Sequence, residues 1–210
     1  MMNFRTIKTA ITGIFGAAES GRYQTIGFQR QSKNAAEVLG SNRFVQVFFS
    51  SGDFPESGGS RSGTKNHEVT YRIELTASAS SKIDLSVFAS GTEAQKSAAI
   101  AAHLEASQEA DNSIDELIDI VYQVIMNNRN LDLGLPVGTV TNRWISSIQK
   151  DTPPNQGEYV IMTASMNLTL RTTEEVTGDT GTTPDIVEMD TTIKYQEDQD
   201  DKSGVLVTNV

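Results

Sequence analysis

The chain has 210 residues, a formal net charge of −10 and no cysteine. The absence of cysteine excludes disulfide bonds and thiolate metal sites, and two histidines leave little for zinc chemistry. No stretch approaches the ~20 apolar residues that a transmembrane helix needs. The last 39 residues, from Thr172 to Val210, hold ten acids against two lysines, which leaves a charge of only −2 for the rest. A nearly neutral body with an acidic end argues against tight binding of DNA.

The first predicted element is a helix over residues 3–18. Large apolar residues recur there at steps of three and four, which places on one helix face Phe4, Ile7, Ile11, Ile14 and Phe15. Gly21 favours a helix end. Threonine and glycine interrupt the apolar stretch, so it lacks the long hydrophobic region of a signal peptide, and we expect synthesis in the cytoplasm. Residues 22–42 are predicted to form a polar connector with a short helix near 35–39.

Two strands are expected next, over residues 43–49 and 67–80, with a loop over 50–66 between them. The first is rich in β-branched and aromatic residues. The second alternates strictly between an apolar set (Val69, Tyr71, Ile73, Leu75, Ala77) and a polar set (Glu68, Thr70, Arg72, Glu74, Thr76). This alternation predicts a long strand with one buried face and one half-exposed face.

The second half of the chain is predicted to contain two helices and a strand pair. An alanine-rich helix opens at Thr92 and runs to about Ala110, and a second helix follows, with Ser113 and Glu116 spaced as a capping box. Two strands, 139–150 and 158–172, are joined by a Pro/Gly turn at 151–157. The last strand is expected to point inward with Val160, Met162, Ala164, Met166, Leu168 and Leu170.

This order of elements predicts an α+β fold. We expect an antiparallel or mixed β-sheet flanked by helices, with a long inter-strand loop and an acidic C-terminal extension. The domain is expected to span residues 1–173. Residues 174–210 are expected to form an acidic arm that is extended or disordered on its own, because few large apolar residues are present there.

The stretch ESGGSRSGTK, residues 56–65, nearly matches the phosphate-binding pattern G-x-x-x-x-G-K-[ST]. Thr64 and Lys65 stand in the reverse order, however. The stretch also leads into a predicted strand, whereas a phosphate loop leads into a helix whose N-terminus faces the phosphate. The sequence therefore favours a flexible connecting loop. A small nucleotide-binding enzyme stays as a disfavoured alternative, which titration with ATP and GTP would test.

The titratable residues show no catalytic or metal-binding spacing. His67 and Glu68 are neighbours on a strand and so point to opposite faces. His103 has no second histidine or cysteine to complete a metal site. The acids at 115–119 are explained by the preference for negative charge at a helix start, and the G-x-S-x-G elbow of serine hydrolases is absent. We therefore predict a protein that is not an enzyme and uses no cofactor.

Four segments carry a family resemblance: the leading helix, the strand HEVTYRIELTASAS, the helix ending in LIDIVYQVI, and the strand pair VTNRWISSIQKDTPPNQGEYVIMTASMNLTLRT. Over residues 1–173 their order resembles the tail terminator (tail completion) proteins of long-tailed bacteriophages. The resemblance implies a virion subunit of the tail and neck, forming a ring that is usually six-fold. Such a ring caps the tail tube, ends its polymerisation and joins the tail to the head. The partners implied are the other copies of a homohexamer, the tail tube protein and neck or connector proteins. DNA would only pass through the lumen, and no membrane is involved.

Two sets of residues are expected to mediate this assembly. The strand at 67–80 is expected to pair across subunits, and the interface residues are expected to be His67, Thr70, Arg72, Glu74, Trp144 and Tyr159. The long loop and the hairpin turn are expected to touch neighbours or line the channel through Arg61, Lys65, Asp151, Pro153 and Pro154. Other assignments left open by the sequence are a tail tube subunit, a head–tail connector component, and a bacterial adhesion or secretion subunit.

Overall fold

The computed structural model describes residues 4–26, 42–54, 64–80, 86–151 and 159–175, together with the dipeptides Tyr195–Gln196 and Val205–Leu206. The chain divides into two units, Met1–Glu175 and Val176–Val210. In the second unit the two dipeptides pair antiparallel as β6 and β7. The short helix predicted near residues 35–39, and the prediction that the acidic arm is extended or disordered, concern residues outside those described.

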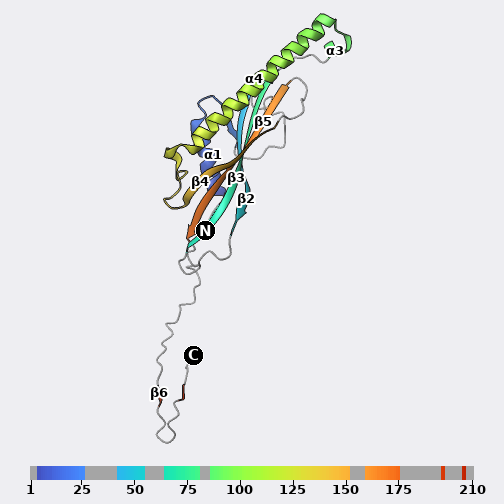
Figure 1. The fold of residues 1–210 in the computed structure, drawn as a ribbon. Helices are drawn as coiled ribbons and strands as arrows, with labels where there is room; N and C mark the ends of the chain where they lie inside the picture. The colour runs from blue at the N-terminus through green and yellow to red at the C-terminus, as the bar shows by residue number, and fades with distance from the viewer. Residues whose placement is uncertain are drawn as a thin grey trace. The chain divides into compact units, whose positions relative to one another are not determined.

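The first unit is built on a five-stranded mixed sheet in the order β1-β2-β3-β5-β4 (Figure 1). Its strands are β1 Gln24–Ile26, β2 Arg43–Asp53, β3 Thr64–Ser80, β4 Val140–Asp151 and β5 Tyr159–Glu175. β1 runs parallel to β2, and the other neighbouring pairs are antiparallel. β3 and β5 pair along their whole lengths, from Thr64 opposite Glu175 to Ser80 opposite Tyr159. The α+β class with a mixed sheet is therefore confirmed.

The helices are α1 Phe4–Ala18, α3 Ser86–Ser90 and α4 Glu93–Met126, followed by the short 3-10 helix η1 Asn128–Asn130. α4 is continuous over 34 residues, so the prediction of two successive helices is wrong. Ser113 and Glu116 do not cap a helix start. Both accept hydrogen bonds of 2.6 Å from the Arg43 guanidinium of β2, so they join the middle of α4 to the sheet.

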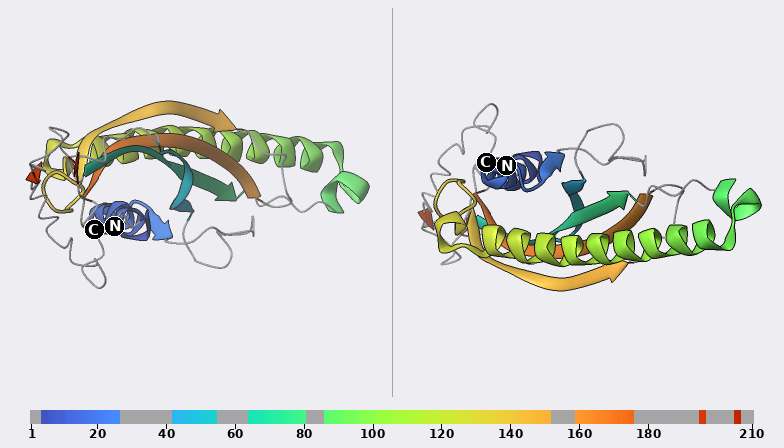
Figure 2. Two further views of the ribbon diagram at one scale, coloured as in Figure 1. Left: turned by 90° about the horizontal axis from the view of Figure 1, so that it is seen from below. Right: turned by 90° about the horizontal axis from the view of Figure 1, so that it is seen from above.

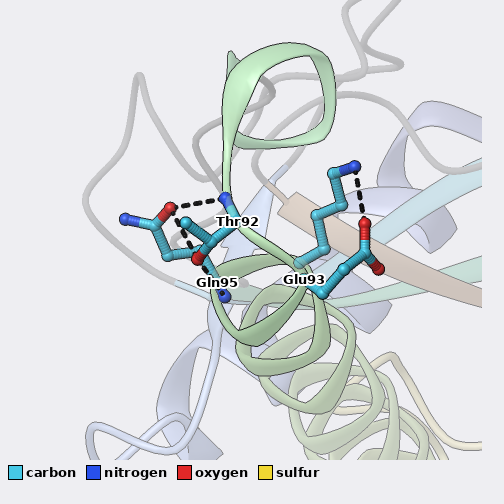
Figure 3. A network of polar contacts seen from close by, with 4 residues as sticks. Thr92, Glu93 and Gln95 are labelled. Carbon is cyan, nitrogen blue, oxygen red and sulfur yellow. Dashed lines mark hydrogen bonds and ion pairs between the residues drawn. The ribbon is translucent and has the colours of Figure 1, made fainter.

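The N-terminus of α4 carries the capping box instead (Figure 3). The Thr92 side chain accepts a hydrogen bond of 3.3 Å from the backbone N–H of Gln95, and the Gln95 side chain accepts one of 2.8 Å from the backbone N–H of Thr92. Lys96 and Glu93 add an ion pair of 3.1 Å one turn into the helix. These contacts satisfy N–H groups that would otherwise lack a partner at the helix start.

The core lies on one face of the sheet, where both long helices pack. The alternation predicted for β3 is confirmed, because Val69, Tyr71, Ile73 and Leu75 have no solvent exposure. Opposite them are the buried residues of the helices: Ile7, Ile11 and Phe15 of α1, and Ile114, Leu117, Val121 and Ile125 of α4. The inward side of β5 is buried as predicted, with Met162 only partly so. The helices thus cover a single face. The other face is mostly polar on β3 and β5, and on β2 it carries the buried Phe44, which forms a small separate cluster with Ile26.

Candidate interaction surface

On the polar face of the sheet, short hydroxyl and amide side chains form a row across β3, β5 and β4. The Thr70 and Thr169 hydroxyls are 3.2 Å apart, and the Thr169 hydroxyl donates to the Ser146 hydroxyl over 3.2 Å. Arg72 and Glu74, next along β3, form an ion pair of 3.4 Å. These groups are largely paired with one another, so the face is polar without carrying a single sign of charge.

The sheet order corrects the expected role of the strand at 67–80. β3 lies between β2 and β5 and hydrogen-bonds to both, so its backbone is not available to a neighbouring subunit. The prediction that it pairs across subunits is wrong. Alternation reveals which face of a strand is polar but not how many neighbours it has. Thr70, Arg72 and Glu74 nevertheless remain half-buried on the polar face.

The other expected interface residues have different positions. His67 is only 8% exposed, because it shares the core side of β3 with Val69, and its ring lies 5.1 Å from that of Phe54. His67 therefore presents little exposed surface for the expected contact with another subunit, which stays a prediction. Trp144 is half-buried on β4 opposite Thr169, on the polar face. Tyr159 begins β5, and its side chain is outside the described residues.

The expected loop contacts fall largely outside the described residues. Arg61, Pro153 and Pro154 lie there, and only the backbone of Lys65 is described, paired with Glu174. Asp151 is the exposed last residue of β4 and accepts a hydrogen bond of 3.3 Å from Gln149. β3 begins at Thr64, so the Gly/Ser-rich stretch leads into a strand, as predicted, and not into the helix that a phosphate loop requires.

The first three turns of α4 extend past the ends of the strands, together with α3 (Figure 2). The first fully buried residue of α4 is Ala106, thirteen positions after the helix begins at Glu93. Two large aliphatic side chains in the extending part are exposed, Ile100 by 51% and Leu104 by 64%. The sequence did not reveal this surface, because apolar residues four apart on a helix ordinarily face a core.

A groove runs between α1 and the C-terminal end of α4. Its volume is about 460 Å³, and it is lined by Ala10, Gly13, Ile14, Ala17, Ala18, Val124, Asn127 and Asn130. None of these eight side chains is charged. Gly13 lies on its open side, since a Cβ atom added there would meet nothing within 4 Å. The groove is therefore an uncharged, mainly aliphatic surface with room above it.

Arg143 of β4 fixes the end of α4 beside this groove. Its guanidinium donates hydrogen bonds to the carbonyl of Asn127, over 2.6 Å, and to the carbonyl of Asn130. These carbonyls lie at and just after the C-terminus of α4, where they also accept backbone hydrogen bonds from Asn130 and Leu133 respectively. Burial lowers the pKa of Arg143, and the nearby Asp132 opposes that shift. The guanidinium stays charged at any ordinary pH, so it anchors the helix end permanently.

A second cation holds α4 further along. Lys150 of β4 lies 2.6 Å from a carboxylate oxygen of Asp111 and 2.8 Å from one of Asp115. Hydrogen bonds that Lys150 donates to Asp111 and then to Asp115 raise the pKa of Lys150. Arg43, Arg143 and Lys150 thus bind α4 from two strands, and all three contacts lie within its second half or just beyond it.

Within the described ranges, no group of three or more histidine and acidic side chains is arranged to hold a metal ion. Across the same ranges, no helix has the length and hydrophobicity needed to cross a membrane.

A comparison with models of known protein families gives no match. A comparison with curated protein sequences gives no significant match either.

Proposed function

We propose that this protein is a structural subunit of a bacteriophage tail. It forms a ring that caps the tail tube, ends the polymerisation of the tube and joins the tail to the neck of the capsid. The proposal starts from the resemblance of residues 1–173 to tail terminator proteins. The α+β fold, with its leading helix, central long strand, long helix and final strand pair, is compatible with it.

The observation that carries the proposal is the N-terminal part of α4, residues 93–105, which extends past the sheet. We call this part the extending half. A helix that leaves its own sheet and exposes Ile100 and Leu104 presents surface that an isolated domain would bury. Contiguous exposed apolar surface marks contacts with other proteins, and Ile100 and Leu104 lie one helical turn apart on the same side of α4. A ring subunit needs such contacts, and the uncharged groove on the same molecule offers a second one.

The distribution of charge also supports this role. The first 171 residues carry a net charge of only −2, and the remaining residues carry −8. A surface without a strong positive field does not hold the phosphate backbone. DNA can therefore pass through a ring of such subunits without being arrested.

Electron microscopy and tube-length measurement test the proposal together. The purified protein is imaged in negative stain, and its mass is measured by light scattering. It is then added to polymerising tail tube protein of the same virus. We expect discrete rings that stop tube growth, so that tubes become shorter as more protein is added. Tubes whose length does not depend on the protein contradict the proposed function.

A tail tube subunit is the second candidate, and the edge of β4 favours it. Among the described strands β4 pairs only with β5, which leaves an outer edge running from Val140 to Asp151. An open edge of this length allows strand addition between subunits. Two register shifts in β4, between Val140 and Asn142 and between Ile145 and Ser147, interrupt that edge. Long cylinders formed by the protein alone would favour this candidate over a terminating ring.

A further inference from the structure

The extending half of α4 carries an apolar ridge formed by Ile100, Ala101 and Leu104. The ridge lies near the anchored part of the helix, not at the free end at Glu93. Ile100 and Leu104 are one helical turn apart, so their side chains lie side by side. Their exposures of 51% and 64% mean that neither is covered by the part of the chain that the structure describes. Ala101 is also exposed, and its small side chain leaves the two larger ones prominent. The ridge has the form of an apolar protrusion that no described segment of its own subunit covers.

The groove between α1 and α4 has the complementary form. The α1 side of the groove is formed mainly by alanine and glycine, whose small side chains leave it shallow. Ile14 and Val124 supply aliphatic contact surface. Its volume of about 460 Å³ accommodates more than one aliphatic side chain. Exposed Gly13 and Ala17 leave the groove open to an approaching helix. A helix can pack closely where small residues let two backbones approach.

The ridge cannot fill the groove of its own chain. Leu104 and Val124 belong to the same helix and are twenty positions apart, which corresponds to roughly 30 Å along the axis and about half a turn around it. A ridge and a groove so far apart on one rigid helix can meet only between two copies. The two surfaces differ, so this contact is head-to-tail and repeats from copy to copy, closing a ring when the rotation permits.

Charged side chains flank both surfaces. Arg22 donates a hydrogen bond of 3.0 Å to the carbonyl of Ala18 at one end of the groove, and exposed Arg129 lies between two of its lining residues in sequence. Glu105 and Glu109 are exposed next to the ridge. Glu19 beside Arg22, and Lys96 one helical turn before Ile100, carry the opposite signs, so neither surface has a single sign of charge and charge repulsion does not oppose the contact.

We propose that Ile100 and Leu104 of one copy insert into the groove between α1 and α4 of a second copy. This contact deepens the ring proposed above and rests on it. It identifies the partner of the extending helix as another molecule of the same chain. It also explains why α4 continues past the sheet without a core to cover.

Two glycines of α1 provide a matched test. Gly13 and Gly16 are both exposed, and a Cβ atom added at either position meets nothing within 4 Å, so we expect leucine at either site to be tolerated, which the unfolding midpoint of each variant checks. Only Gly13 lines the groove. We expect Gly13→Leu to lower the assembled mass in light scattering to that of a monomer, and Gly16→Leu to assemble like the unmodified protein. Equal assembly of the two variants would overturn the contact.

Cross-linking tests the same contact by position. The chain has no cysteine, so Ala17→Cys and Leu104→Cys each introduce the only thiol. A short bismaleimide should join the two variants when they are mixed, and should join neither variant to itself. In the double variant the products should form a ladder of increasing mass. Absence of the mixed product, or of self-association at any concentration, overturns the contact.

The results separate this contact from the proposed function. Rings that form and shorten tubes, but are unaffected by Gly13→Leu and give no mixed cross-link, overturn the contact while the ring function stands. Cross-linked rings that do not limit tube length support the contact and contradict the tail terminator function.

Discussion

The two halves of α4 differ in what stabilises them. From Ala106 to Ile125 the helix presents seven buried residues to the sheet and to α1, and Arg43, Arg143 and Lys150 bind it or the turn that follows. From Glu93 to Glu105 it has no fully buried residue. The anchored half is held by tertiary contacts of buried residues, and the extending half, among the described contacts, by its capping box, its ion pair, packing against α3 and the high helix propensity of alanine.

This difference indicates two roles for one continuous helix. Helix propagation is favourable once a turn exists, so an anchored segment can carry a further three turns into solvent at little cost. The fold does not require those turns, and their aliphatic side chains gain nothing from the core of their own subunit. The anchored half is therefore structural, and the extending half is the part we assign to contact with another copy.

The largest expected contrast is between two leucines of α4. Leu117 has no solvent exposure, so Leu117→Ala should lower the free energy of unfolding by about 3 kcal/mol through lost burial and a cavity. Leu104 is 64% exposed, and Leu104→Ala should change that free energy by no more than about 0.5 kcal/mol. Urea unfolding of the dissociated protein measures both. Equal losses would mean that the extending half is part of the folding core.

Arg143 tests the anchor at the end of α4. Arg143→Met keeps much of the aliphatic bulk but leaves the carbonyls of Asn127 and Asn130 without their charged donor. We expect a loss of about 2 kcal/mol in the free energy of unfolding. Exposed Arg129 is the control, and Arg129→Met should have little effect. If the two variants lose the same amount, Arg143 does not anchor the helix end.

The sequence predicted the anchored elements because their periodicity is strong. Alternation along β3 and β5 and the three-to-four spacing in α1 reflect burial on one face, which a single chain segment records by itself. The prediction that this region forms two helices was wrong because it relied on a local pattern alone. Ser113 and Glu116 match a local capping pattern, but they bind Arg43, some seventy positions earlier in the chain. No local pattern reveals that contact.

Tyr71 connects α1 to the sheet and gives a pH-dependent test of the anchored region. Its hydroxyl donates a hydrogen bond of 2.9 Å to the Phe4 carbonyl, and burial raises its pKa above the ordinary 10.0. The native state therefore keeps a proton that the unfolded chain releases above pH 10. This stabilisation is present below pH 10 and is lost as the pH rises further.

Replacing the tyrosine separates the hydrogen bond from the titration. Tyr71→Phe should cost about 1 kcal/mol at neutral pH and make the loss of stability above pH 10 less steep. Burial also raises the pKa of Tyr23, so Tyr23 should maintain part of the pH dependence of stability. Urea unfolding across this pH range measures the effect, with Tyr122→Phe, a change at a 43% exposed side chain, as the control. An unchanged alkaline slope in Tyr71→Phe contradicts this account.

The smallest expected effect is at the capping box. Thr92→Ala removes the side chain that accepts from the Gln95 N–H and should weaken the first turn by about 1 kcal/mol. Because the extending half has no buried residue, we expect it to open separately from the core, so this loss should appear as faster hydrogen exchange near Glu93, with the global unfolding transition unchanged. Ser97→Ala, in the same half but outside the cap, should not increase exchange. A lowered global stability would show that the two halves unfold together.

The positions of the candidate contacts were less predictable than the fold. The alternation of polar residues in β3 suggested a strand with an unpaired backbone edge. Whether a strand lies at the edge or in the centre of a sheet depends on the strand order, which is set by segments far apart in the sequence. The three-residue β1 is too short for a periodic pattern to indicate it. Ile100 and Leu104 look like core positions, and only the end of the sheet leaves them exposed.

The central claim is that the extending half of α4 is the assembly surface, and one comparison tests it directly. The unmodified chain and the Ile100→Ser, Leu104→Ser double variant are examined by light scattering and negative-stain electron microscopy at equal concentrations. We predict rings for the unmodified chain, and a monomer with an unchanged unfolding midpoint for the variant. Rings formed equally well by the variant would contradict the claim.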